Sequence, residues 1–175
     1  MNRESIDWRG PMVAVITPFD RDGNIDEANF SSNVRRMFDN RATGIVVGGC
    51  TGEFWALSHD ERCHLFQLGV KSAEGRGTVI VGTGAVTVEE TIQLTSEAER
   101  TGCNGALILP PYFVQLTEDQ LFHHYENISA AVNIPIMLYN IPGNAVNAIT
   151  PALAARLADL DRVVAIKESS GDWNN

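Results

Sequence analysis

The stretch GIVVGGCTGE, residues 44–53, decides the fold. It begins as a short, continuously apolar run and ends in a turn, GGCTGE, that contains three glycines. A run this short and this uniformly apolar is typical of a parallel strand buried on both faces, not of a half-exposed antiparallel strand. Similar runs begin near residues 13, 44, 78, 105, 134 and 163, at intervals of 27 to 34 residues.

The segments between these runs carry helix signals. Ser58, Thr87 and Thr117 are each followed three residues later by Glu or Gln, which is the spacing of a capping box. Thr150 followed by Pro151 is typical of an N-cap with proline at the first helical position. Apolar residues recur on one face of these segments, which predicts helices packed against a sheet.

Alternating strands and helices with right-handed crossovers predict an α/β fold, either an open doubly wound sheet or a (β/α)8 TIM barrel. The barrel is favoured because the units are evenly spaced and polar or glycine-rich loops follow several strands, whereas an open sheet concentrates such loops at one switch point. Only the first six of eight strands are present. We therefore expect residues 1–175 to form a single, incomplete TIM-barrel domain whose first and sixth strands have unpaired edges.

The amino-acid composition limits the kinds of molecule that the protein is expected to bind. A chain of 175 residues with 44% hydrophobic and 20% charged residues has the size and composition of one domain. The net charge of −9 and the pI near 4.8 argue against nucleic-acid binding, which needs clustered Lys and Arg. The polar N-terminus and the lack of a long apolar stretch predict no membrane partner and a cytoplasmic location.

The cysteines and histidines predict neither a disulfide framework nor a metal site. Cys50, Cys63 and Cys103 are odd in number, widely spaced and form no C-x-x-C pair. The four histidines show no metal-ligand spacing. We expect no metal, and we interpret Cys63 and Cys103 as small core residues.

Lys167 is the first candidate for chemistry, because it ends the apolar run that starts at Val163. A lysine after buried residues is often only the solvated end of a strand. The alternative is a desolvated amine that loses its proton and attacks a carbonyl to form a Schiff base. Tyr139 ends the preceding run, so we expect both side chains at one barrel mouth, about one strand spacing apart. A phenol beside an amine can relay protons.

The turn GGCTGE is the second candidate. Its glycines allow backbone N–H groups to approach an anion closely, and Thr51 adds a hydroxyl donor. It can therefore hold a substrate carboxylate, although a turn needed only to leave the strand has the same composition. The phosphate-loop pattern is absent. We interpret Glu53 as a structural loop carboxylate.

Three motifs together carry a resemblance: G-C-T-G-E at residues 49–53, Y-N-I-P at 139–142 and I-K-E at 166–168. In this order the chain resembles the dihydrodipicolinate synthase and N-acetylneuraminate lyase family over the first three-quarters of a family barrel, which continues past the C-terminus in a full-length member. The resemblance implies a class I lyase in which Lys167 forms a Schiff base with pyruvate or another 2-keto acid. Tyr139 would shuttle protons, and the turn of Cys50, Thr51 and Gly52 would bind the keto-acid carboxylate.

The resemblance also implies that no cofactor is needed, because the protonated imine of the lysine is itself the electron sink. The family tends to form dimers and tetramers, so we expect a homo-oligomer.

Departures from the synthase pattern bear on the second substrate. Cys50 stands where the synthases usually have a threonine, and Phe113 where they usually have a tyrosine. A thiol is only a weak donor and a phenyl ring has none, so neither residue fully replaces the hydroxyl group of the synthases. The relay of hydroxyl groups is therefore broken unless Tyr112 rearranges. Asn144 stands where an arginine usually binds the carboxylate of the aldehyde substrate. A neutral amide suits hydroxyl groups better. We therefore expect a 2-keto-3-deoxy sugar acid as substrate and aldolase-type cleavage, with Asn144 binding it.

Three alternatives remain. A keto-deoxy sugar acid dehydratase would use the same imine but release water instead of pyruvate and an aldehyde. A 4-hydroxy-tetrahydrodipicolinate synthase would condense pyruvate with aspartate semialdehyde. Finally, a non-catalytic truncated remnant would keep Lys167 but leave it hydrated in an open half-barrel, with a pKa near its ordinary value of about 10.4.

Overall fold

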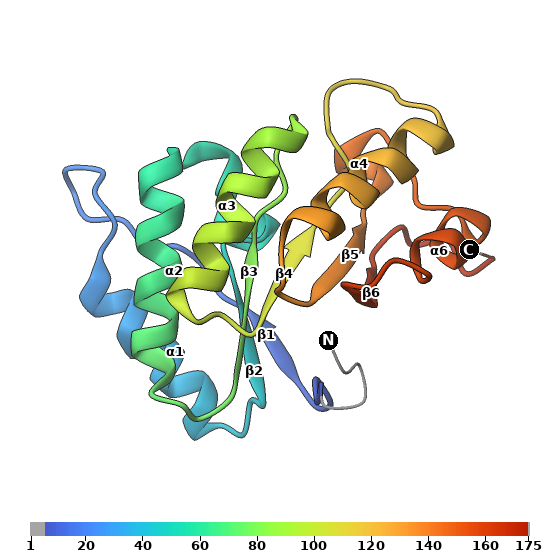
Figure 1. Cartoon of the computed structure of the whole chain (residues 1–175). Coiled ribbons are helices and arrows are strands. Elements are labelled where there is room, and N and C mark those ends of the chain that lie inside the picture. The colour runs from blue at the N-terminus through green and yellow to red at the C-terminus, as the bar shows by residue number, and fades with distance from the viewer. Residues whose placement is uncertain (1–5, 175) are drawn as a thin grey trace.

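The computed structural model describes residues 6–174, in which strands and helices alternate along the chain (Figure 1). The strands are β1 (Met12–Ala14), β2 (Gly44–Val47), β3 (Thr78–Gly82), β4 (Gly105–Ile108), β5 (Ile136–Asn140) and β6 (Val163–Glu168). The main helices are α1 (Glu27–Asp39), α2 (His59–Ala73), α3 (Val88–Thr101), α4 (Glu118–Ala131) and α6 (Pro151–Leu157). Short helical turns are η2 (Cys50–Gly52), η3 (Phe54–Ala56) and α5 (Pro142–Ala145).

The six strands form one parallel sheet in the order β1-β2-β3-β4-β5-β6. An open doubly wound sheet reverses its strand order at a switch point, and this sheet does not. Strictly sequential parallel strands with helices on the outside are the arrangement of a (β/α)8 barrel. The predicted TIM barrel with its first six strands is therefore confirmed.

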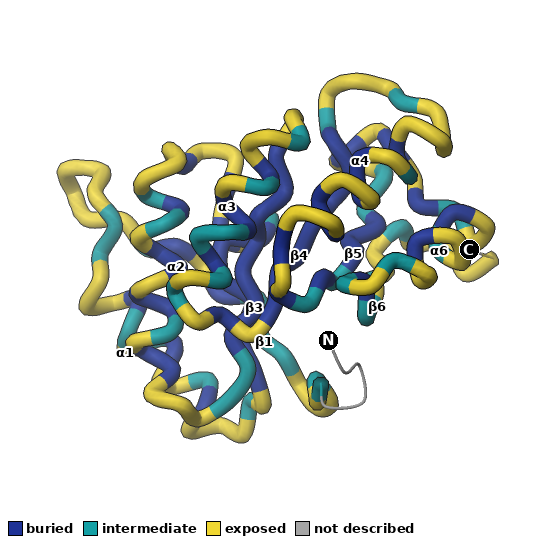
Figure 2. The backbone as a smooth tube through the Cα atoms, in the orientation of Figure 1, coloured by how far each residue is buried: buried dark blue, intermediate teal, exposed yellow. Residues whose placement is uncertain are grey.

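Both faces of the central strands β2, β3 and β4 are buried, as their apolar sequences predict, whereas β1 and β6 at the two edges of the sheet are more exposed (Figure 2). Ile45 and Val47 of β2 belong to the core between sheet and helices. Val46, between them, belongs to a second cluster that includes Ile80 and Tyr139. Successive side chains of a strand point to opposite faces, so the second cluster marks the barrel interior.

The helices begin where the capping signals predict. The boxes of Ser58 and Thr117 are complete: each hydroxyl accepts the backbone N–H of the residue three positions on at 3.3 Å, and the side chain of that residue accepts the backbone N–H of the cap. The box of Thr87 forms in half, because its hydroxyl accepts the Glu90 N–H at 3.2 Å. Thr150 caps α6 through the N–H of Leu153 at 3.1 Å.

The sheet has an unpaired edge at each end, as expected. Within residues 6–174, β1 pairs with β2 alone and β6 pairs with β5 alone. Ile166 of β6 is 43% exposed. An apolar groove runs between β6 and α6, lined in part by Val164, Ala165 and Ala154. Within the same described residues, no helix combines the length and the apolar composition needed to cross a membrane.

His124 on α4 generates a prediction about stability. It is buried, and its Nε2 has no hydrogen-bond partner in the described part of the chain. Burial lowers its pKa from 6.5 to about 4, against a smaller opposing effect of Glu89. A histidine pKa below its unfolded value means that protonation favours the unfolded state, so stability is lost as the pH falls below 6.5. Between pH 7.5 and 5, His124 should reduce the free energy of unfolding by about 2 kcal/mol.

Urea unfolding of the wild type and of His124→Gln at both pH values measures this contribution. The variant should lose about 2 kcal/mol less stability than the wild type over this range. The neighbouring His123 is exposed and bonds Glu126 at 2.9 Å, so His123→Gln serves as the matched control. Equal pH dependence in wild type and His124→Gln would contradict the prediction.

Candidate functional site

Lys167 and Tyr139 lie side by side at the carboxyl ends of β6 and β5. They are direct partners in the parallel register, and the lysine Nζ lies 4.0 Å from the centroid of the tyrosine ring. The predicted proximity is therefore present in the structure. An ammonium at this distance from a ring face is attracted by the ring's quadrupole.

The surroundings change the protonation of both groups. Burial lowers the pKa of Lys167 from its ordinary 10.5, and the nearby Cys50 opposes this in part. Burial is also the main reason that the pKa of Tyr139 rises to about 12. Desolvation disfavours the charged form of each group. The arrangement therefore holds an amine that gives up its proton more readily than usual beside a phenol that keeps its own.

Cys50 and Ser169 complete the surroundings of Tyr139. The tyrosine hydroxyl shares hydrogen bonds with both side chains; the bond with Cys50 raises the pKa of Tyr139, and the bond with Ser169 lowers it. Cys50 starts η2 directly after β2, and Ser169 follows β6. Ser169 was missed by sequence reasoning, although it lies two positions after Lys167, where the chain leaves the strand on the same side of the sheet.

The turn GGCTGE packs tightly on its neighbours. A Cβ at Gly82 of β3 would lie 2.0 Å from the Gly48 carbonyl oxygen, so only glycine fits there. Thr17, which follows β1, donates to the Gly52 carbonyl at 2.7 Å. Thr51 is exposed at the tip of the turn, and Glu53 is exposed as well. The turn is thus held against β1 and β3 while the Thr51 side chain faces solvent.

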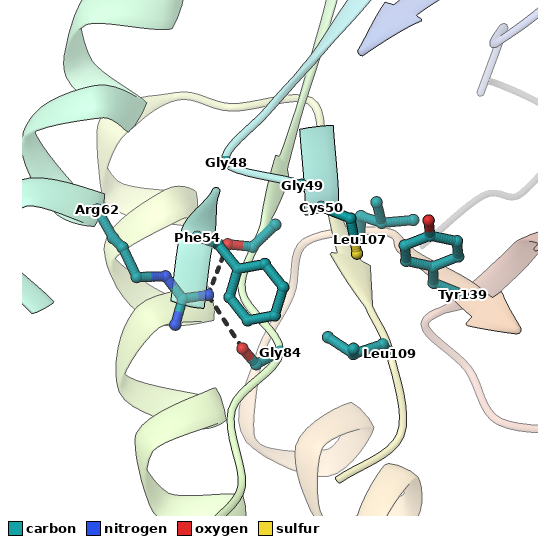
Figure 3. Close-up of a pocket in the computed structure, with 10 residues that line it drawn as sticks. Gly48, Gly49, Cys50, Phe54, Arg62, Gly84, Leu107, Leu109 and Tyr139 are labelled. Carbon is teal, nitrogen blue, oxygen red and sulfur yellow. Dashed lines mark hydrogen bonds between the residues drawn. The ribbon is translucent and has the colours of Figure 1, made fainter. Parts of the chain in front are cut away.

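A small pocket lies at the carboxyl ends of the strands (Figure 3). The predicted residues Cys50 and Tyr139 line it, and four further contributors were not predicted: Phe54, Arg62, Leu107 and Leu109. The remaining lining is glycine, at positions 48, 49, 82 and 84. Lys167, Thr51, Gly52 and Asn144 are not among the lining residues.

Arg62 of α2 is the unexpected charge in this pocket. It is only 4% exposed, and its guanidinium donates to the carbonyls of Gly82 and Gly84 at 2.9 and 3.0 Å (Figure 3). Its Cζ lies 5.2 Å from the centroid of the Phe54 ring. A signal existed in the sequence, because Arg62 precedes the buried Leu65 and Phe66 by three and four positions and so lies on the buried helix face.

Asn144 lies farther out, on the segment that follows β5. It belongs to α5 and its side chain is exposed. The segment is held at both ends by buried asparagines. Asn140 donates to Glu168 at 2.7 Å and accepts the Ile149 N–H at 2.9 Å, and Asn147 bonds the loop after β4.

Of the other two thiols, Cys103 is buried in the core, as predicted, and Cys63 is partly buried and packs against it. Burial raises the pKa of Cys63, and raises that of Cys103 to about 12. A thiol that is hard to ionise is a poor nucleophile and metal ligand. Residues 6–174 contain no group of three His, Cys, Asp or Glu side chains placed to hold a metal ion.

Comparison with known proteins decides the family. The model of the dihydrodipicolinate synthetase family matches residues 7–175. The chain belongs to this family.

Individual family members agree with this assignment. The 4-hydroxy-tetrahydrodipicolinate synthase of Syntrophobacter fumaroxidans is 42% identical over 164 residues, which cover 94% of this chain and 56% of that protein. Dihydrodipicolinate synthase from Acinetobacter baumannii, solved with pyruvate, has a TM-score of 0.91 at 35% identity over 93% of this chain and 56% of that one. YagE from Escherichia coli K12, also solved with pyruvate, has a TM-score of 0.91 at 28% identity, covering 95% and 56%. The chain thus spans little more than half the length of these relatives.

Proposed function

We propose that the protein is a class I lyase in which Lys167 forms a Schiff base with pyruvate or a related 2-keto acid. The observation that carries the proposal is the contact between Nζ of Lys167 and the ring of Tyr139, 4.0 Å apart, with the pKa of the amine lowered by burial. Family membership supports it, as do two similar structures that were solved in complex with pyruvate.

The chemistry follows from the two side chains. The neutral amine of Lys167 attacks the keto carbon, and loss of one water molecule leaves a protonated imine. Tyr139, whose pKa of about 12 keeps it protonated, donates a proton to the departing oxygen and recovers one later. The imine withdraws electrons from the adjacent carbon–carbon bond, so no further cofactor is required.

The carboxylate of the keto acid needs donors beside the amine. In the turn of Cys50, Thr51 and Gly52, the Gly52 N–H already bonds the Gly49 carbonyl at 3.0 Å, so the proposed donors are the backbone N–H groups of Cys50 and Thr51 and the exposed hydroxyl of Thr51. In this proposal Cys50 also contacts Tyr139, through the hydrogen bond that the phenol shares with the thiol. Asn144, exposed on α5, is the proposed contact for the second substrate.

The second substrate has two candidates. Curated relatives are named 4-hydroxy-tetrahydrodipicolinate synthase, which supports condensation with aspartate semialdehyde better than the sugar-acid cleavage that the sequence predicted. We take the synthase reaction as the first candidate. Cleavage or dehydration of a 2-keto-3-deoxy sugar acid is the second, and the neutral Asn144 and the hydroxyl-free Phe113 favour it.

The proposal extends to assembly and domain limits. Exposed apolar side chains gather on the loops after three consecutive strands: Trp55 after β2, Val86 after β3, and Phe113 and Val114 after β4. Trp55 is 61% and Phe113 88% exposed, and patches of this kind favour association, so the protein is a homo-oligomer in this proposal. Residues 1–175 are part of one barrel domain that continues in full-length members, and the expected cytoplasmic location stays a prediction.

Reductive trapping tests the imine. The chain contains only two lysines, Lys71 and Lys167, so an adduct is easily assigned. Incubation with pyruvate and sodium borohydride should add one reduced pyruvyl group at Lys167 in the wild type and in Lys71→Ala, and none in Lys167→Ala. Because burial lowers the pKa of Lys167 below 10.5, the rate of trapping should rise with pH and reach half its maximum below pH 10.5.

Intact mass and peptide mass spectrometry measure the adduct and its position. Label divided between Lys71 and Lys167 would contradict a selective amine. No adduct on a folded wild-type chain would favour the truncated-remnant alternative, in which Lys167 is hydrated.

Substitution of Asn144 separates the two candidate substrates. If the synthase reaction is correct, Asn144→Arg should lower the KM for aspartate semialdehyde about tenfold, because a charged hydrogen bond to a carboxylate contributes roughly 1.5 kcal/mol or more. If the sugar-acid reaction is correct, the wild type should release pyruvate from 2-keto-3-deoxygluconate, and Asn144→Arg should weaken that activity. A dehydratase would consume this substrate without releasing pyruvate.

Light scattering tests assembly. The wild type should have at least twice the mass of one chain, and Phe113→Asp should shift it toward the monomer, because a charge cannot be buried cheaply in an apolar contact. Exposed Val146 lies on another loop, so Val146→Asp is the control. A wild type that is monomeric at micromolar concentration would refute the proposed homo-oligomer.

A further inference from the structure

Asn147 joins the two loops that carry the residues expected to meet the second substrate. It follows α5, is 4% exposed, and directs its side-chain hydrogen bonds to the loop between β4 and α4. Its Nδ2 donates to the carbonyls of Pro111 at 2.6 Å and Val114 at 2.7 Å. Its Oδ1 accepts the Leu116 N–H at 2.9 Å. Both amide hydrogens and the amide oxygen are therefore used.

The bonds to Pro111 and Val114 enclose Tyr112 and Phe113. Phe113 has φ of +74°, a conformation that a bulky residue rarely adopts, and is 88% exposed, so its own side chain provides little packing to hold it. Such a backbone persists only when its surroundings fix it. The Asn147 amide, bonded on both sides of this dipeptide, is the contact that does so.

The second loop is strained next to Asn147. Val146 has φ of +66°, unfavourable for a β-branched residue, and is 54% exposed. Two positions earlier lies Asn144, the proposed contact for the second substrate. Asn147 thus connects the loop that contains Phe113 with the loop that contains Val146 and Asn144. Its hydrogen bonds hold the two loops in a fixed arrangement.

Lys167 and Tyr139 do not depend on this bridge. They are positioned by the backbone ladder between β5 and β6, which the Ser169 N–H extends by donating to the Asn140 carbonyl at 2.9 Å. We propose that Asn147 is a positioning residue that holds the β4–α4 and β5–α6 loops as one unit and thereby sets binding of the second substrate, while imine formation is independent of it. This inference rests on the proposed Schiff-base function.

Asn147→Asp tests the inference. Aspartate keeps the size and the acceptor for the Leu116 N–H, but it loses both donors and places a carboxylate oxygen against two carbonyls. Asn127 on α4 is exposed, so Asn127→Asp adds the same charge away from the site as a control. Asn147→Ser, which keeps one donor, is the second variant if Asn147→Asp does not fold by circular dichroism.

Two readouts are combined. Pyruvate trapping at Lys167 should stay within twofold of the wild type in Asn147→Asp, whereas the KM for the second substrate should rise tenfold or more. The substrates tested are aspartate semialdehyde with pyruvate, and 2-keto-3-deoxygluconate alone. Hydrogen–deuterium exchange of residues 109–117 and 141–150 should become faster in both segments. Asn127→Asp should change none of these.

The outcomes are distinguishable. No adduct in the wild type overturns the proposed function and, with it, the substrate part of this inference. A normal adduct with unchanged KM, or an adduct lost in parallel with second-substrate activity, overturns the positioning role alone. Unchanged exchange in either loop overturns the bridge between them whatever the enzyme turns over.

Discussion

The parallel register between β5 and β6 is the constraint on which the site depends. A shift by one residue would turn every β6 side chain to the opposite face, which would move Lys167 out of the barrel interior and bring Glu168 into it. The register pairs Tyr139 with Lys167 and Asn140 with Glu168. The second pair is joined by a 2.7 Å hydrogen bond on the face opposite the amine. The hydrogen bond between Asn140 and Glu168 thus holds β5 and β6 in the register that places Lys167 beside Tyr139.

The pocket next to Tyr139 is lined in part by a buried charged side chain, Arg62. Removing a guanidinium from water costs several kcal/mol, and hydrogen bonds must offset that cost. Arg62 recovers part of it from the carbonyls of Gly82 and Gly84 and from the face of Phe54, while its Nε has no hydrogen-bond partner in residues 6–174. These contacts connect α2 to the carboxyl end of β3. They support the ring of Phe54, which makes a T-shaped contact with the ring of Tyr112 at a centroid distance of 5.8 Å.

Features that depend on neighbouring residues in the sequence could be predicted, whereas features that depend on contacts between distant residues could not. The strands, the helix caps and the meeting of Tyr139 with Lys167 depend on short periodic patterns and on the geometry of parallel sheets, and the structure agrees with them. Arg62 and Asn147 were not predicted, because their partners lie 20 to 36 positions away in the chain. Polar residues in such places gain a role only from backbone groups that folding brings to them. The exposure of Thr51 was equally hidden, because motif spacing does not reveal which way a turn residue points.

The proposed reactivity of Lys167 depends on the edge of the sheet at which β6 lies. Desolvation is the main cause of its lowered pKa, so the amount of water around the amine controls the fraction of nucleophile. Within the described residues β6 pairs on one side only, and Ile166 beside Lys167 is 43% exposed. A segment that paired with the free edge of β6 would remove water from that side and lower the amine pKa further, without touching Tyr139 or the Cys50 turn. In the proposed mechanism, imine formation therefore depends on how far the barrel closes around β6, as well as on the residues at the barrel mouth.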